Sequence, residues 1–574
     1  MPVVYEFGPF QFDTARFGLL RNGEAVPVSP KAKDVLRVLL ERSGQVVEKE
    51  DLMNLVWPDT AVEDANLTQT IFMLRKALDA SRDHPSYIAT VARRGYRFLP
   101  EVRALAPSTA ADRPTPLESV AVLPFATLGM PPDEEYLGLG LADALITRLS
   151  NIANLQVRPT STIRQSATLP PNIVAIGRLL RVDALVEGTI QHLAERIRVT
   201  VQLVDVRSGT PVWAERFEER FNDLFAVQDA MTQRIAASLV PRLTRADAVR
   251  LANRSTTNPA AHREYLKGRY HWNKRTGDGV RRSLDHFRTA IAIDPAYALA
   301  YLGIADCYVV LGHYGWWMPR QAASAARAAA LRALELDETL ATAHATLGTI
   351  YTAPDCDWDG AARAFRRAIE LAPNDAKTRN WYANHLACLG RLDEAVSQAT
   401  RAVDLDPLNL TWNMGIGHML YLARRFEEAI EQERRTLDMD DRFAQAYWIL
   451  GLCSEQIGRP ADAVEALRRA ADLSGGNPLL TGLFARACAL AGHAREARAA
   501  LATLLADNRS RYVAADAVGL TYAGLGDIDE AFDWLDVAAE HGCYSLTFLQ
   551  VSPLFDPLRG HARFARLART LHLT

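Results

Sequence analysis

The chain has 574 residues, of which 49% are hydrophobic, and its formal net charge is −3. This length predicts several domains, and the hydrophobic content is ample for buried cores, so long disorder is not expected. The near-neutral charge excludes a globally basic protein, so any contact with nucleic acid must come from a local patch.

The spacing of the cysteines and histidines, and the lack of long apolar runs, exclude several other classes of protein. All six cysteines follow residue 300 and none forms a CxxC pair, while the thirteen histidines do not cluster at ligand spacing, so we expect no metal and no cofactor. The cysteines are typical of small apolar fillers in a reducing compartment. The N-terminus lacks a basic leader, and no run of 18 apolar residues occurs, so we expect a cytoplasmic protein that has no membrane contact.

The first hundred residues alternate between strand and helix patterns. Tyr5 to Val28 alternates apolar and polar residues, which predicts a small antiparallel sheet. Ser29 and Pro30 are typical of a helix start, and the segment that follows, KAKDVLRVLLER, has one apolar face. A second helix is expected from near Glu48 to a point before Trp57.

A third helix is predicted over residues 66–78, with the sequence NLTQTIFMLRKAL. At about 100° per residue, one side of this helix is apolar and should pack inward; it comprises Leu67, Ile71, Leu74 and Leu78. The opposite side holds Gln69, Phe72, Met73 and Lys76, with Thr70 and Arg75 on the flanks. Such a face can bond base edges and phosphates in a major groove, although a lone helix with these residues is more often just solvated.

A basic hairpin follows the third helix, and its presence favours DNA contact over an ordinary solvated helix face. The segment TVARRGYRF, residues 90–98, predicts two strands around an Arg-Arg-Gly turn. Arg93 and Arg94 at the turn could reach a minor groove or phosphates, while Tyr96 and Phe98 should anchor the hairpin to the core.

The blocks VVEKEDLMNLVW, NLTQTIFMLRKALD and YIATVARRGYRF occur in this order within the first 104 residues. They resemble the winged helix of OmpR/PhoB-type regulators, and more closely the CadC/ToxR-like branch. In that family the third helix enters the major groove and the wing meets the minor groove of double-stranded DNA. The resemblance implies that Gln69, Thr70, Phe72, Met73 and Arg75 face the bases and that Lys76, Arg93, Arg94 and Arg97 lie near the backbone.

The same resemblance implies further partners. Residues 57–65 match the loop that touches RNA polymerase in some relatives, and a homodimer would suit paired half-sites. Many relatives carry arginine where this chain has Phe72 and Met73, which could contact thymine methyls or lower the affinity. No phosphoacceptor domain precedes the predicted winged helix, so a conventional two-component output protein is not expected.

Residues 105–118 are rich in proline, alanine and serine and predict a linker. Alternating strand and helix patterns then predict a small α/β domain over residues 119–243. Gly138-Leu139-Gly140 is not a GxGxxG motif, and Asp183, Glu187 and Asp205 are scattered acids typical of strand ends and surfaces. The order of elements resembles the N-terminal domain of TolB, which implies binding or assembly rather than catalysis.

From residue 261 to 574 the chain is helical with repeated punctuation. Steps of 34 residues separate Ala372, Asp406 and Asp440, and the motif GRLDEA at residue 390 recurs in related form at 425, 458 and 526. This period is typical of tetratricopeptide repeats, which stack into an all-α superhelix. Residues 315–320, GWWMPR, are expected to form an insertion.

The concave face of such a superhelix holds a protein or peptide ligand, and Asn384, Asn413 and Arg379 are candidate groove residues. For each of them singly, an ordinary polar helix surface is the stronger interpretation. The aromatic residues of the repeats, Tyr297, Tyr301, Trp381, Tyr382, Tyr447 and Trp448, are interpreted as packing within repeats rather than as a ligand cage. Asp355 to Gly360 begins like an EF-hand loop, but Arg366 stands where the bidentate glutamate belongs, so a capped helix start fits better.

The sequence contains no GxxxxGK[ST], HExxH or GxSxG motif, so no catalytic residue is assigned and no enzyme is expected. The predicted fold class is therefore multidomain: a winged helix-turn-helix of the α+β type, a small α/β domain and a tetratricopeptide-repeat superhelix. The leading hypothesis is a sequence-specific transcriptional regulator whose repeats receive a protein, peptide or small-molecule signal. The alternatives are a scaffold whose winged helix mainly contacts protein, and a middle domain with an enzymatic or ligand-sensing site.

Overall fold

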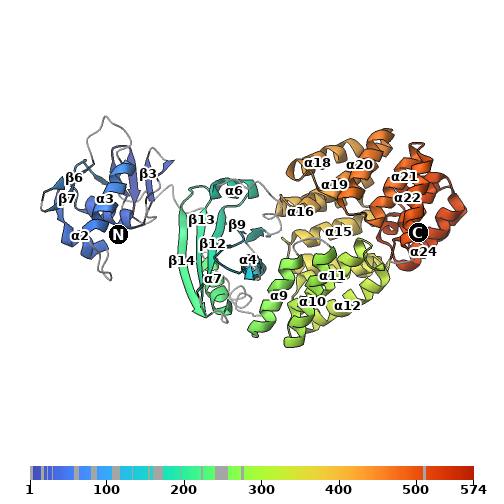
Figure 1. Cartoon of the computed structure of the whole chain (residues 1–574), viewed down its shortest axis with the longest axis horizontal. Helices are drawn as coiled ribbons and strands as arrows, with labels where there is room; N and C mark the ends of the chain where they lie inside the picture. The colour runs from blue at the N-terminus through green and yellow to red at the C-terminus, as the bar shows by residue number, and fades with distance from the viewer. Residues whose placement is uncertain are drawn as a thin grey trace. The chain divides into compact units, whose positions relative to one another are not determined.

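The structure is a computed structural model whose residues divide into two compact units (Figure 1). Residues 1–117 belong to the first unit, and the second contains nearly all of the rest. The structure describes residues 4–14, 18–21, 24–26, 28, 30–56, 64–78, 87–92, 94–105, 117–131, 134–150, 152, 155–158, 172–193, 196–220, 224–239, 256–272, 277–508 and 512–573.

Two antiparallel sheets and three helices make up the first unit. The larger sheet has the strand order β4–β3–β2–β1–β8, and the smaller has the order β5–β7–β6. The strands are β1 (Val4–Phe7), β2 (Phe10–Asp13), β3 (Gly18–Arg21), β4 (Glu24–Ala25), β5 (Val46–Glu48), β6 (Ile88–Val91), β7 (Gly95–Phe98) and β8 (Arg103–Leu105). The helices are α1 (Pro30–Glu41), α2 (Lys49–Val56) and α3 (Asp64–Leu78).

The core of the first unit joins the helices to both sheets. The predicted apolar face of α1 is buried at Val35, Leu36, Leu39 and Leu40. Phe98 on β7 packs edge-on against Phe7 on β1, with ring centroids 5.1 Å apart. The predicted sheet, helices and hairpin are confirmed, whereas strands β5 and β8 were not predicted. Ser29, at the predicted start of the first helix, and Trp57, after the predicted second helix, lie outside the described residues.

The second unit begins with an α/β region. Its sheet has the order β11–β9–β12–β13–β14, and β10 pairs with β12; β9 runs parallel to both β11 and β12. The strands are β9 (Ser119–Val122), β10 (Ala126–Leu128), β11 (Gln156–Arg158), β12 (Ala184–Leu193), β13 (Arg196–Asp205) and β14 (Pro211–Arg220). The helices are α4 (Tyr136–Leu149), α6 (Ile173–Leu180) and α7 (Leu224–Leu239).

Packing explains the residues of this region that resembled a chemical motif. A Cβ at Gly138 would lie 2.2 Å from the Phe125 carbonyl oxygen, so this glycine allows α4 to approach the sheet. Asp183 accepts hydrogen bonds from the Ser119 backbone nitrogen (3.0 Å) and hydroxyl (2.7 Å), which joins the starts of β9 and β12. Asp205 accepts from the backbone nitrogens of the turn that follows β13. The predicted structural role of these acids is confirmed.

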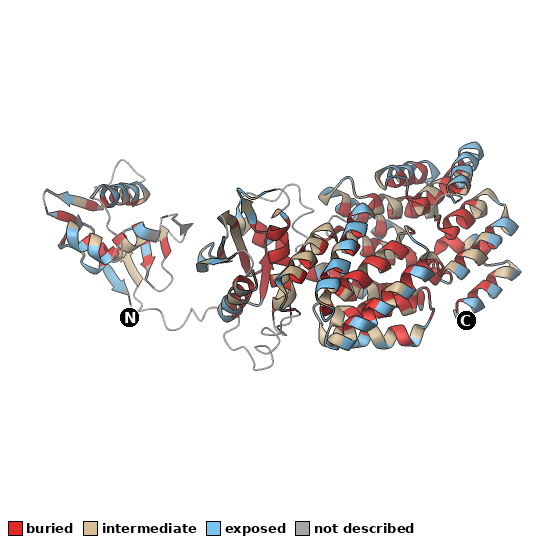
Figure 2. Cartoon of the chain, turned by 60° about the horizontal axis from the view of Figure 1, so that its bottom comes forward, coloured by how far each residue is buried: buried red, intermediate tan, exposed pale blue. Residues whose placement is uncertain are grey.

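The rest of the second unit is a curved array of helix pairs (Figure 1). Its helices are α9 (Pro259–Trp272), α10 (Gly277–Ile293), α11 (Ala298–His313), α12 (Pro319–Leu336), α13 (Ala341–Thr352), α14 (Trp358–Leu371), α15 (Ala376–Cys388), α16 (Leu392–Leu405), α17 (Leu410–Leu422), α18 (Phe426–Met439), α19 (Ala444–Gln456), α20 (Pro460–Leu473), α21 (Pro478–Leu490), α22 (Ala494–Asp507), α23 (Ala515–Leu525), α24 (Ile528–His541) and α25 (Ala562–Thr570). Two 3-10 helices, η2 (Tyr544–Phe548) and η3 (Pro553–Leu558), lie between α24 and α25. Buried residues face the neighbouring helices and exposed residues line the outside (Figure 2).

Small residues where the two helices of a pair cross permit this stacking. Gly348 on α13 faces the Phe365 ring of α14, and a Cβ at this glycine would lie 2.9 Å from the ring. Gly451 on α19 faces Leu467 of α20 in the same way, with a distance of 2.5 Å. The predicted capped helix start is also confirmed, because Asp357 accepts a hydrogen bond of 2.9 Å from the Gly360 backbone nitrogen at the beginning of α14.

Among the residues that the structure describes, no helix is both long and apolar enough to cross a lipid bilayer.

Candidate nucleic-acid interface

Helix α3 is fixed in the first unit by one apolar face. Leu67, Ile71, Leu74 and Leu78 are buried to 2% exposure or less, as their spacing predicts. Helices α1 and α2 pack against this face, so α3 cannot rotate without exposing its four apolar side chains. The opposite face is thereby presented outward.

The outward face of α3 combines polar and apolar side chains. Gln69, Phe72, Met73 and Lys76 are all exposed, and Phe72 and Met73 retain 60% and 52% of their accessible surface. Thr70 lies on the flank, half-buried, and its hydroxyl donates to the Asn66 carbonyl oxygen at 2.8 Å. Exposed apolar side chains beside an amide and an amine are typical of a surface that contacts a macromolecule.

Arg75 is placed differently from the other candidates. Its Nε and Nη2 donate to the Ile88 carbonyl oxygen at 3.0 and 2.8 Å, and Nη2 also donates to Thr90 Oγ1 at 2.8 Å. These bonds join the last turn of α3 to strand β6 of the wing. In the free protein Arg75 therefore holds the helix and the wing together and does not point outward beside Gln69.

The wing presents arginines on its solvent side. Arg94 lies in the turn between β6 and β7 and is exposed; its backbone nitrogen donates to the Val91 carbonyl oxygen at 3.0 Å. On β7, Tyr96 and Phe98 point into the core, whereas Arg97 between them is exposed. The predicted anchoring of the hairpin is confirmed. Arg93 lies outside the described residues, as does most of the loop at 57–65.

Gly95 allows the wing to pair with β5. This glycine is opposite Glu48 in the β5–β7 ladder, and a Cβ there would lie 1.9 Å from the Val47 carbonyl oxygen. Because a backbone atom cannot move aside as a side chain can, only glycine fits without shifting a strand. The position of the wing arginines thus depends on this residue.

The groove residues expected on the repeats divide into two groups. Asn384 lines a cavity inside the array and also donates to the Asn380 carbonyl oxygen at 2.9 Å. Asn413 donates to the Pro407 and Asn409 carbonyl oxygens, and Arg379 donates to the Pro373 carbonyl oxygen. Three of the six aromatic residues interpreted as packing within repeats also line the cavity, namely Tyr297, Trp381 and Trp448. Helix periodicity could not reveal this, because a cavity depends on the curvature of the whole array.

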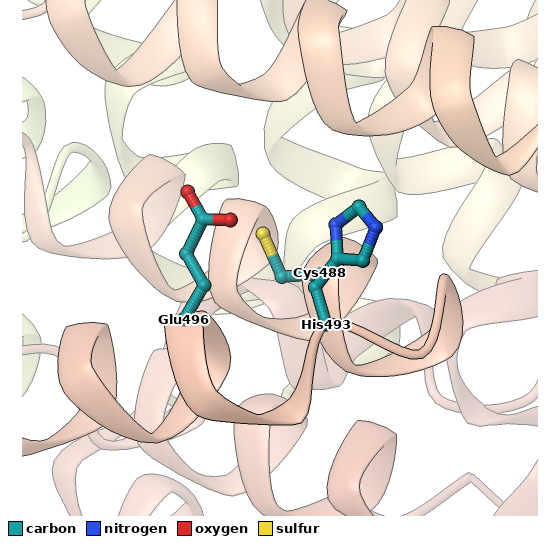
Figure 3. A group of neighbouring side chains, drawn as sticks. All are labelled: Cys488, His493 and Glu496. Carbon is teal, nitrogen blue, oxygen red and sulfur yellow. The ribbon is translucent and has the colours of Figure 1, made fainter.

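One group of potential metal ligands has neither the CxxC spacing nor the clustered histidines of a typical metal site. Cys488 of α21 lies near His493 and Glu496 at the start of α22, and their ligand atoms are all within 4.8 Å of one another (Figure 3). Burial raises the pKa of the Cys488 thiol to about 11, which disfavours the thiolate that would bind zinc. We assign no metal here.

Comparisons with known families match each part of the chain. Residues 23–98 match the family described as transcriptional regulatory protein, C terminal. Residues 117–237 match the second domain of HilA/YgeH-like transcriptional regulators. Tetratricopeptide-repeat families match the overlapping segments 357–409, 389–442, 417–478 and 457–517. The likeness of the middle domain to TolB stays a prediction.

Individual relatives agree with this division. The transcriptional regulator HilA of Salmonella typhimurium is 26% identical over 391 residues, which are 68% of each chain. The transcriptional activator CadC of Escherichia coli is 39% identical over 80 residues, 14% of this chain and 16% of that one. A protein of Rhizobium meliloti named putative adenylate cyclase 3 is 30% identical over 217 residues, 37% of this chain and 36% of that one.

These findings identify the class of protein that the fold and the interface define: a winged-helix transcriptional regulator. More particularly, its N-terminal domain is of the OmpR/PhoB type, and an α/β second domain and C-terminal tetratricopeptide repeats follow. The chain is similar to HilA and CadC and, over 84 residues at 33% identity, to the cholera toxin transcriptional activator of Vibrio cholerae. The predicted family and fold class are confirmed. DNA and protein are its general classes of partner.

Proposed function

We propose that the chain regulates transcription by placing α3 in the major groove of a promoter and its wing along the adjacent backbone. The observation that carries the proposal is the outward face of α3, where Gln69, Phe72, Met73 and Lys76 are exposed together on a rigidly packed helix. Gln69 can bond adenine, Phe72 and Met73 can contact thymine methyls, and Lys76 can approach a phosphate. Thr70, on the flank, is the fifth candidate contact.

In this proposal the basic residues of the wing neutralise phosphates. Arg94 and Arg97 are exposed on one side of the hairpin, and the resemblance adds Arg93. Arg75 acts as a positioning residue, because its guanidinium bonds to β6 instead of facing outward. Each phosphate that a lysine or arginine neutralises adds about 0.9 to the salt dependence of binding.

The remaining expectations belong to the same proposal. The domains extend over residues 1–104, 119–243 and 261–574, a dimer binds paired half-sites, and the loop at 57–65 contacts RNA polymerase. We further propose that the chain is not an enzyme, since its sequence contains no GxxxxGK[ST], HExxH or GxSxG motif. Its six cysteines are free and buried, which supports a cytoplasmic location.

Selection from random duplex DNA tests the proposal with the full chain. We expect enrichment of one sequence, bound with an affinity that falls steeply as salt rises. The Gln69→Ala/Lys76→Ala variant should lose this selectivity. The matched control, Gln11→Ala/Arg103→Ala, alters an exposed amide and an exposed cation on the five-stranded sheet and should retain it.

A second function is favoured by the same exposed apolar pair. Phe72 and Met73 would also suit a protein surface, in which case the winged helix belongs to a scaffold. Flat enrichment in the selection, with weak binding that salt abolishes equally in both variants, would reject DNA recognition and favour this alternative.

A further inference from the structure

The helical array encloses a cavity of about 1190 Å³. The first helices of successive pairs line it, α11, α13, α15, α17, α19, α21 and α23, because these helices face the inside of the curve. Small-molecule sites typically occupy 300–1000 Å³, so the cavity is large enough for an organic ligand.

The C-terminal segment of the chain occupies part of the concave side. Tyr544, Ser545 and Phe548 of η2 and Leu554 of η3 line the cavity together with the first helices. Long-range hydrogen bonds close the curve: Asn477 Nδ2 donates to the Tyr314 carbonyl oxygen at 3.0 Å, and Arg320 Nε donates to that of Glu540 at 2.8 Å. The C-terminal segment and these hydrogen bonds thus leave a chamber on the concave side instead of the open groove that an extended peptide would need.

Aromatic rings from five elements form one wall of this chamber. In order along the wall, the lining rings are His313, Trp381, Tyr544, Phe548, His418 and Trp448. Successive contacts have centroid distances between 4.3 and 6.3 Å: His313–Tyr544, His313–Trp381, Trp381–Tyr544, Tyr544–Phe548, His418–Phe548 and His418–Trp448. Aromatic faces grouped in this way attract cations through their negative quadrupoles.

The charged groups around the chamber favour the same kind of ligand. Among the described residues, the lining includes four cationic side chains, Arg148, Arg269, Lys377 and Arg442, and eight carboxyls, Asp143, Asp306, Asp337, Glu370, Asp375, Asp406, Asp440 and Asp516. Burial lowers the pKa of the lining histidines, to about 3 for His262 and about 4 for His313 and His418, so they add no positive charge at neutral pH.

Two polar groups lie beside the aromatic wall. The Asp516 carboxylate is buried, accepts from the Ala517 backbone nitrogen at 3.1 Å and is also bonded by the Ser545 hydroxyl, next to Tyr544. Burial raises the pKa of Asp516, as expected for a carboxyl removed from water. The Tyr544 hydroxyl has no hydrogen-bond partner among the described residues, and its oxygen can accept from an ammonium group.

We propose that this chamber binds a small organic ammonium ion, whose cationic group lies against the aromatic wall near Asp516. This ligand is the signal that the repeats receive, so the inference rests on the proposed regulatory function. A peptide of the same charge would have to displace the C-terminal segment, whereas a small cation needs no such rearrangement.

Tryptophan fluorescence of the full chain provides the test. The probes are 2-phenylethylammonium and phenylacetate, which are similar in size and opposite in charge, at constant ionic strength. We expect saturable quenching by the ammonium ion and at least tenfold weaker binding of the carboxylate. Trp381→Leu and Asp516→Asn should each weaken binding about tenfold, whereas Trp381→Phe should retain most of it.

Trp317→Leu is the matched control, because Trp317 is exposed and does not line the chamber. Equal binding of both probes, absence of saturable binding, or equal loss in Trp381→Leu and Trp317→Leu would overturn the proposal. Circular dichroism of each variant identifies one that has failed to fold, and Trp381→Phe then decides. A chain that selects DNA but binds no ammonium ion contradicts the chamber alone; the reverse result contradicts the regulatory function alone.

Discussion

The substitution Arg75→Ala tests whether Arg75 positions the wing or contacts DNA directly. The change removes three hydrogen bonds of 2.8–3.0 Å, two of them to the same Ile88 carbonyl oxygen. Charged donors contribute about 1.5–3 kcal/mol per hydrogen bond when shielded from water. Because Arg75 is half-buried and one acceptor is shared, we expect a loss of about 2 kcal/mol in the stability of the contact between α3 and the wing.

Hydrogen exchange of the free full chain measures this loss. A decrease of about 2 kcal/mol in the free energy of local opening corresponds to about 30-fold faster exchange of the β6 and β7 amides. Lys76→Ala is the control on the same helix turn, because Lys76 is exposed. It should leave exchange unchanged and reduce the salt slope of DNA binding by about 0.9.

A double-mutant cycle with Thr90→Val tests whether Arg75 acts through the wing. The hydrogen bond from Arg75 to Thr90 Oγ1 predicts a coupling of about 0.5–1 kcal/mol between the two changes. The reasoning is refuted if Arg75→Ala leaves wing exchange at the wild-type rate while lowering the salt slope by about one. That result would make Arg75 a direct DNA contact.

Three further changes test the physical account of the two units. Gly95→Ala should destabilise the first unit by about 3 kcal/mol, because its Cβ meets a backbone oxygen at 1.9 Å; calorimetry should show its transition alone shifted down. Burial raises the pKa of the Glu433 carboxyl, so the wild-type second unit loses stability as pH rises and this group ionises. Glu433→Gln removes that loss and should therefore stabilise the unit by an amount that grows with pH. A gain in stability that is independent of pH would contradict this. Burial depresses the folded pKa of His262, His313 and His418, so the stability that each contributes above pH 6.5 is lost as pH falls, toward pH 3 for His262 and toward pH 4 for the other two. In that range each histidine should lower the free energy of unfolding by about 1.4 kcal/mol per pH unit. Denaturant titrations of the His313→Gln variant should show a shallower dependence on pH.

Local patterns predicted the parts of the fold that depend on neighbours in the sequence. The spacing of Leu67, Ile71, Leu74 and Leu78 predicted which face of α3 is buried, because helix geometry alone determines which residues share a face. The same periodicity predicted that Gln69 faces outward. Alternation and turn residues likewise predicted the hairpin that places Arg94.

Contacts between distant residues were beyond that reasoning. Arg75 has the angular position of a flank residue, yet its guanidinium reaches a carbonyl 13 residues away, and only the position of the wing decides this. Strand β5 has three residues and exists because β7 pairs with it. The closure of the repeat array depends on Asn477 and Tyr314, which are 163 positions apart. Side-chain type at one position cannot indicate such partners.

In the repeats, a glycine of one helix regularly faces a bulky apolar side chain of the next helix, and Glu433 is an exception to this pattern. A glycine of one helix faces a bulky side chain of the next in the pairs Gly348–Phe365, Gly451–Leu467 and Gly519–Leu535. In the pair Gly417–Glu433 that bulky side chain is a carboxylic acid, fully buried, and neither oxygen has a hydrogen-bond partner among the described residues. An apolar residue at position 433 would remove the desolvation cost of about 1–3 kcal/mol for such a group. The repeat array therefore tolerates at α18 a residue that its own packing rule disfavours, and this exception makes its stability depend on pH.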